Sequence, residues 1–167
     1  MRTLEKSFVR GLLAGAMLAL AVAAVGVAPA SAEEIEFRGG GYINNFSNAC
    51  AAKGFVDPVY VSSIYRPRRI GTNGDATRIS FFFPQFYAAS YELPKGRLGK
   101  GFKKVVGGAT SSATYFFDNN PRMRIKVKSP ERVRSKTEAV TLSGTIRNFD
   151  GIDGCTADFD LSLRQRP

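Results

Sequence analysis

Apolar and polar side chains alternate one by one along most of the chain after residue 32, and this pattern constrains the fold more than any other feature. Successive side chains of a β-strand point to opposite faces, so a period of two predicts strands with one buried face. Gly, Pro, Asn and Asp recur between the alternating segments and are typical of turns. We therefore expect an all-β fold, either an antiparallel β-sandwich or a small β-barrel of about 8–10 short strands.

The turn residues place the individual segments. A cluster of alanines at 48–54 favours a short helical turn, and the triple glycine at 39–41 is expected to separate two strands. The segment 94–104 holds three glycines and five basic residues and is expected to be a mobile loop. The expected strands are 34–38, 41–46, 58–66, 77–83, 85–93, 105–106, 109–117, 122–128, 131–136, 138–149 and 155–164.

The last two of these strands show the alternation most clearly. If both apolar sets face one core, the two strands can pair only in registers that keep those sets on the same side of the sheet. We expect a register with 151–154 as a four-residue loop, because it places opposite charges across from each other. Such a cross-strand pair stabilises the sheet by about 0.2–1 kcal/mol. In that register the cross-strand pairs are Arg147 with Asp158, Ile146 with Phe159, and Leu142 with Leu163.

The first 32 residues have the organisation of a secretory signal peptide. Arg2, Lys6 and Arg10 precede the apolar stretch 12–27, and small residues of the A-x-A type end at Ala32. We expect cleavage after Ala32, export by a Sec-type pathway and a periplasmic or extracellular product, with an uncleaved anchor as the alternative. The remaining residues, 33–167, have the length of a single β domain and contain no second apolar run long enough for a membrane helix.

Two cysteines, Cys50 and Cys155, are present. In an oxidising compartment an even number of cysteines favours a disulfide, which here would join the N-terminal region to the last strand. A free reactive thiol is the alternative.

The chain is strongly basic, with a formal net charge of +10. The expected leader holds three basic residues and one acidic residue, so its removal leaves +8. Sixteen Lys and Arg residues lie between Arg66 and Lys136, against four Asp and Glu. Such a surface either keeps the protein in solution or attracts a polyanion. For an exported protein we expect an anionic glycan, a lipid headgroup or an acidic protein as the partner, and no nucleic acid.

One strand carries the most specific basic pattern. Along 122–128 the apolar residues Met123, Ile125 and Val127 share one face, which leaves four cations as a ladder on the other. The ladder is either an anion-binding face or an edge strand whose charges prevent aggregation. Further basic residues in the next segment and in the glycine-rich loop extend the candidate surface. The candidate anion-binding residues are Arg122, Arg124, Lys126, Lys128, Arg132, Arg134, Arg97, Lys100, Lys103 and Lys104.

The chain contains no His, which excludes Ser-His-Asp and Cys-His catalysis and every zinc site that needs an imidazole. No motif for a cofactor or a metal is present, and 96–101 does not match a phosphate-binding loop. Four carboxylates near the C-terminus, Asp150, Asp153, Asp158 and Asp160, could form a hydrolase pair or a calcium site, or could simply be turn and surface residues.

Aromatic residues gather in 81–91. Phe81 and Phe83 lie on the same strand face as Ile79 and are expected in the core, whereas Phe82 lies on the opposite face.

The sequence is compatible with three functions. The first is a non-enzymatic exported domain that binds an anionic envelope component or partner protein. The others are a small envelope hydrolase that uses a carboxylate pair, and a structural subunit that associates through exposed strands.

Overall fold

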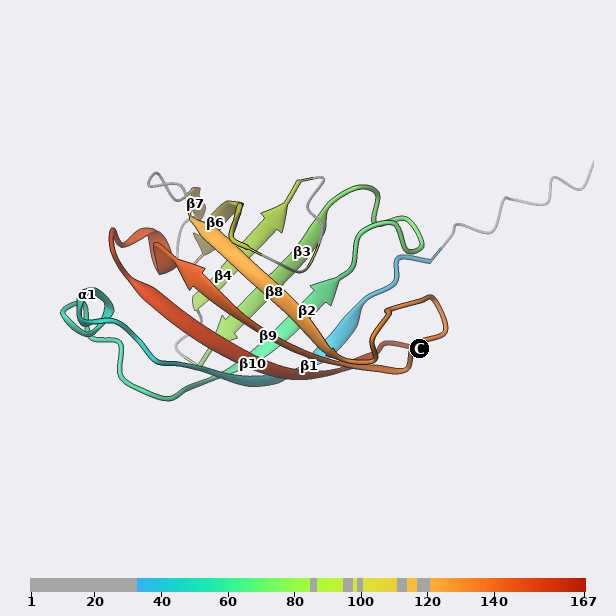
Figure 1. The fold of residues 1–167 in the computed structure, drawn as a ribbon, viewed down its shortest axis with the longest axis horizontal. Coiled ribbons are helices and arrows are strands. Elements are labelled where there is room, and N and C mark those ends of the chain that lie inside the picture. Colours follow the sequence, from blue (N-terminus) through green and yellow to red (C-terminus); the bar gives the residue numbers. More distant parts are fainter. Residues whose placement is uncertain (1–32, 85–86, 95–97, 99–100, 111–113, 117–120) are drawn as a thin grey trace, which may run out of the picture. The chain divides into compact units, whose positions relative to one another are not determined.

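In the computed structural model, residues 33–84, 87–94, 98, 101–110, 114–116 and 121–167 are described, and they form one antiparallel sheet (Figure 1). The expected leader lies outside the described residues. A short helix, α1 (Asn48–Ala51), confirms the expected helical turn, and a 3-10 turn, η1 (Phe149–Gly151), precedes the last strand. The strands are β1 (Phe37–Asn44), β2 (Val59–Arg66), β3 (Thr77–Phe83), β4 (Tyr87–Leu93), β5 (Lys103–Lys104), β6 (Val106–Thr110), β7 (Thr114–Phe116), β8 (Arg122–Ser129), β9 (Ala139–Arg147) and β10 (Thr156–Gln165).

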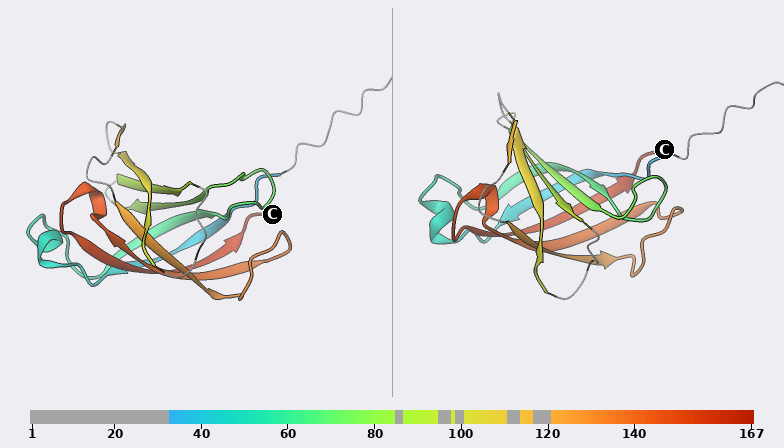
Figure 2. Two further views of the ribbon diagram at one scale, coloured as in Figure 1. Left: turned by 45° about the horizontal axis from the view of Figure 1, so that its top comes forward. Right: turned by 90° about the horizontal axis from the view of Figure 1, so that it is seen from above.

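The sheet curls on itself into a nearly closed, barrel-like layer. Its strand order is β5-β8-β9-β10-β1-β2-β3-β4-β6-β7, and β8, β9 and β10 cross over β2, β3 and β4 in space (Figures 1 and 2). Residues 103–110 connect the two ends of the sheet. β5 pairs with β8 at one end, and β6, which follows β5 after one intervening residue, pairs with β4 near the other end. Val105 joins them, is buried, and donates its N–H to the Pro121 carbonyl at 3.0 Å. The all-β prediction is therefore confirmed.

The interior is filled from alternate positions of the long strands. Ile79, Phe81 and Phe83 are buried, whereas Phe82 is 41% exposed, as the alternation predicts. The rings of Phe81 and Phe159 pack edge to face across the interior with centroids 5.3 Å apart. Such side chains each contribute about 1.5–3 kcal/mol on burial, so this apolar face is the main source of stability.

The triple glycine does not separate two strands, and this prediction was wrong. β1 runs through Gly39, Gly40 and Gly41 and pairs with β10 on one side and β2 on the other. A Cβ at Gly41 would lie 1.9 Å from the Asp160 carbonyl oxygen, and one at Gly39 would lie 2.2 Å from that of Ser162. These glycines therefore let β1 approach β10 closely, a role that glycine fills inside strands as well as in turns.

The register of β9 and β10 differs from the expected one by two residues. The two apolar sets do share the core face, but Arg147 pairs with Thr156, Ile146 with Ala157, and Leu142 with Leu161. The connection is 148–155 rather than the expected 151–154, because Asn148 and Asp150 adopt left-handed backbone conformations and η1 lies between the strands. A register shift of two residues keeps every side chain on the same face of the sheet, so the alternation of apolar and polar residues does not distinguish the two registers.

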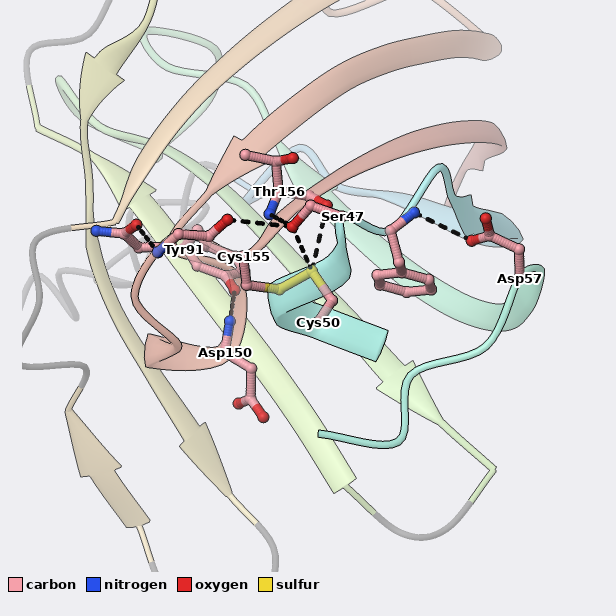
Figure 3. Close-up of a disulfide and its surroundings, with 10 residues drawn as sticks. Ser47, Cys50, Asp57, Tyr91, Asp150, Cys155 and Thr156 are labelled. Carbon is pink, nitrogen blue, oxygen red and sulfur yellow. Dashed lines mark hydrogen bonds between the residues drawn. A yellow bond between two sulfur atoms is a disulfide. The ribbon is translucent and has the colours of Figure 1, made fainter. Parts of the chain in front are cut away.

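The expected disulfide joins Cys50 of α1 to Cys155, which precedes β10 (Figure 3). Around it, Ser47 is bonded to the start of β10 in both directions. The Ser47 N–H donates to the Thr156 carbonyl at 2.9 Å, and the Thr156 N–H donates to the Ser47 hydroxyl at 3.0 Å. The connection between β1 and β2 is thereby held against the turn that precedes β10.

The expected strand 131–136 is a loop. Arg134 and Thr137 form a turn, in which the Thr137 N–H donates to the Arg134 carbonyl at 3.0 Å and the Arg134 N–H donates to the Thr137 hydroxyl at 2.9 Å. Only Val133 of this loop packs against the core. None of the helices in the described part of the chain has the length and apolar character that spanning a bilayer requires.

Candidate functional site

The basic ladder lies on the outer face of β8, as the alternation predicts. Arg122, Arg124, Lys126 and Lys128 are exposed, whereas Met123 and Ile125 between them are buried. β8 is not a free edge along its whole length, because Lys103 and Lys104 of β5 pair with its first two residues. Lys103 and Lys104 therefore belong to a strand, and the prediction that they lie in a mobile loop was wrong.

This pairing creates a row of three cations across three strands. Lys104 lies opposite Arg122 in β8, and Arg122 lies opposite Arg147 in β9. We call these three residues the cationic row. All three are exposed, and within the described part of the chain none forms an ion pair. Like charges directly opposite each other destabilise a sheet by about 0.2–1 kcal/mol per pair, so the row is a concentration of uncompensated positive charge.

One aromatic ring lies beside the row. The Arg147 guanidinium stands 3.8 Å from the centroid of the Phe102 ring, and that of Arg124 stands 5.3 Å from it. Cation–π contacts of this kind contribute about 0.5–1 kcal/mol at exposed sites and hold the guanidinium groups in place. Phe102 thus orders two of the basic side chains without neutralising them.

Neither Arg147 nor Phe102 was among the predicted site residues. The expected register assigned Arg147 an acidic partner, Asp158, which the observed register removes. Phe102 stands in a glycine-rich basic segment, where an isolated aromatic residue was the available signal.

A groove continues from the ladder across the outer face of the sheet towards β1. Its volume is about 880 Å³, and it contains both acidic and basic side chains. We call it the mixed groove. It is lined by Asn44, Asn45, Gly101, Arg124, Lys126, Lys128, Ser143, Gly144, Thr145, Asp158, Phe159 and Asp160.

The carboxylates of the mixed groove compensate part of the ladder. Asp160 forms an ion pair with Lys128, and Asp158 accepts hydrogen bonds from the Thr145 hydroxyl at 2.6 Å and from the Asn45 amide at 3.1 Å. Lys126 forms no ion pair with any described residue. The ladder is therefore compensated near Lys128 and uncompensated from Lys126 towards the cationic row.

The other candidate basic residues lie elsewhere. Arg132 and Arg134 are exposed in the loop between β8 and β9 and do not extend the ladder along a strand. Arg97 and Lys100 lie outside the described residues.

The four candidate aspartates do not form one site. Asp158 and Asp160 line the mixed groove, and Asp153 is an exposed turn residue. Asp150 lines a different cavity of about 450 Å³, with Phe55, Phe83 and Tyr87 among its neighbours.

Burial raises the pKa of Asp150 from 3.8 to about 6. The Tyr87 hydroxyl donates to the Asp150 carboxyl group. The backbone N–H of Asp150 donates to the Tyr91 hydroxyl at 3.3 Å (Figure 3).

Among the residues that the structure describes, no group of three or more His, Cys, Asp or Glu side chains is arranged to hold a metal ion. No protein-family model matches the chain, and neither the curated proteins nor the solved structures give a significant match.

Proposed function

We propose that this protein is an exported, non-enzymatic binding domain that holds an anionic component of the cell envelope on the outer face of β5, β8 and β9. The observation that carries the proposal is the cationic row. Three aligned cations of one sign lower stability unless a ligand or counter-ions compensate them, and an anionic ligand gains from the same charges. The net charge of +8 that remains after removal of the expected leader adds long-range attraction for such a ligand.

A hydrolase that uses a carboxylate pair is less well supported. A glycosidase pair needs one protonated acid and one ionised carboxylate about 5–9 Å apart. Asp158 and Asp160 share a strand face, but the described aspartate with a raised pKa, Asp150, lines another cavity. A structural subunit would associate through a free strand edge. Within the described sheet β5 covers only Arg122 and Met123 of β8, so 124–129 form an open edge, and the cations of the ladder along it disfavour pairing with another strand.

The proposal is tested by salt elution of the purified protein from an immobilised sulfated polyanion such as heparin. We compare Arg122→Gln/Arg147→Gln with the matched control Arg134→Gln/Lys136→Gln, which also removes two exposed cations but takes them from the loop between β8 and β9. The first variant is expected to elute at clearly lower salt than the second, because surface charges act within about one Debye length, ~10 Å at 0.1 M. Equal elution of the two variants contradicts the proposal, since net charge alone would then explain retention.

A further inference from the structure

We infer that the anionic component is an acidic polysaccharide, whose sugar rings lie in the mixed groove and against two neighbouring tyrosines while its acidic groups contact Lys126 and the cationic row. This inference rests on the proposed function and names the ligand class for the same face. Three features support it: the continuity of the surface, the chemistry of the groove and the exposed aromatic rings.

The surface is continuous across five strands. The observed registers place one outward-facing row from β8 through β9, β10 and β1 to β2, and strands spaced about 4.8 Å apart make this row about 19 Å wide. The row consists of Lys126, Ser143, Asp160, Tyr42 and Tyr60. A linear polymer of sugar units fits such an elongated track better than a compact headgroup does.

The groove offers hydrogen-bond acceptors that a simple anion would avoid. The Asp158 carboxylate lines the groove and retains lone pairs beyond its bonds to Thr145 and Asn45. Carboxylates repel phosphate groups and acidic peptides, but they accept hydrogen bonds from sugar hydroxyls. A ligand that presents both hydroxyl donors and acidic groups therefore satisfies the acidic and the basic halves of the surface together.

Two exposed aromatic rings lie at the β2 end of this outward-facing row. Tyr42 in β1 and Tyr60 in β2 lie directly opposite each other and are 37% and 69% exposed. They line a hollow of about 410 Å³ that shares Asn44 and Asn45 with the mixed groove. Exposed tyrosines combine a flat apolar face with a polar tip, and the apolar C–H face of a sugar ring packs against such a face.

The test is titration calorimetry of the purified protein with four probes: polygalacturonate, the neutral polysaccharide dextran, polyphosphate, and vesicles that contain phosphatidylglycerol. We expect binding to polygalacturonate and none to dextran. Tyr60→Ala is expected to weaken polygalacturonate binding about fivefold without changing polyphosphate binding, and Tyr60→Phe should retain most of the affinity. Because the Tyr60 side chain is largely exposed, neither variant should disturb the fold.

A second variant tests the groove itself. Asp160→Asn removes one negative charge, which raises affinity for any polyanion, but it also weakens an acceptor for sugar hydroxyls. The ratio of polygalacturonate affinity to polyphosphate affinity is therefore expected to fall. Arg122→Gln/Arg147→Gln is expected to lower both affinities.

The outcomes separate this inference from the proposed function. Binding to polyphosphate or vesicles with no binding to polygalacturonate, or a Tyr60→Ala variant that binds polygalacturonate like the wild type, overturns the polysaccharide and leaves the anion-binding face intact. If the ratio of polygalacturonate affinity to polyphosphate affinity is unchanged in Asp160→Asn, the mixed groove is not part of the binding site. No binding to any of the anionic probes at low salt overturns both the inference and the proposed function.

Discussion

The disulfide is expected to supply a large part of the stability of this domain. Cys50 and Cys155 are 105 residues apart in the sequence, so the bond closes most of the described chain into one loop. The chain-entropy model assigns about 5 kcal/mol at 25 °C to a loop of this length. Since domains of this size have a total of about 5–15 kcal/mol, Cys50→Ala/Cys155→Ala should bring the protein close to its stability limit.

The contacts around the bond suggest that the folded state survives its removal. The Ser47 hydroxyl accepts from the Thr156 N–H at 3.0 Å and donates to the Gly154 carbonyl at 3.1 Å, and neither contact uses a sulfur atom. We therefore expect a native-like sheet with a lower free energy of unfolding, because the main effect is a larger entropy of the unfolded chain.

The assay is urea unfolding followed by far-UV circular dichroism, since the chain contains no Trp. With a urea slope of about 2 kcal/mol/M, a loss of about 3–5 kcal/mol moves the midpoint down by about 2 M. Wild-type protein unfolded in reductant serves as the control, and its difference from the double variant reports the packing of the two sulfur atoms. A loss below about 1 kcal/mol in both samples would refute the reasoning and mean that the unfolded chain is already compact.

Three further predictions concern the sheet and its charges. Gly144→Ala should cost about 1–3 kcal/mol in urea unfolding, because its Cβ would lie 2.3 Å from both the Arg124 carbonyl oxygen and the Phe159 ring; a variant as stable as the wild type would contradict this packing. Arg122→Gln should raise the free energy of unfolding by about 0.2–1 kcal/mol at low salt, a gain that shrinks as salt is added, whereas a loss would mean that the cationic row is compensated. Asp150 keeps its proton up to about pH 6 in the folded state but loses it near 3.8 when unfolded, so the contribution of Asp150 to stability should be greatest below pH 3.8 and be lost as the pH rises through 6. The fall should be about 1 kcal/mol after discounting the exposed part of the carboxyl group, and the difference between the wild type and Asp150→Asn across this range measures it; a difference that does not vary with pH would refute the shift.

Local sequence patterns were sufficient for the fold class and for the face on which each strand residue lies. Met123 and Ile125 point inward and Arg122 and Arg124 outward because successive side chains of a strand alternate, whatever its partner is. The disulfide was also predictable, since two cysteines allow one intramolecular pairing.

Strand partners were less predictable, because pairing energies of a few tenths of a kcal/mol do not distinguish registers that differ by two residues. The left-handed residues Asn148 and Asp150 set the length of the turn before β10, and with it the neighbours of Arg147. The glycines of β1 look like a strand break until the backbone of β10 is known to lie within 2.2 Å of where a Cβ would be placed at Gly39.

The alternation and composition of the chain are enough to assign an all-β, strongly basic domain with a basic ladder on one strand. Which of these charges become neighbours depends on how the strands pair. Closure of the sheet through 103–110 brings Lys104 beside Arg122, and the observed register brings Arg147 beside Arg122 as well. Side-chain direction depends on local backbone geometry. Cross-strand neighbours depend instead on contacts between segments far apart in the chain, and small differences in turn length and packing decide those contacts.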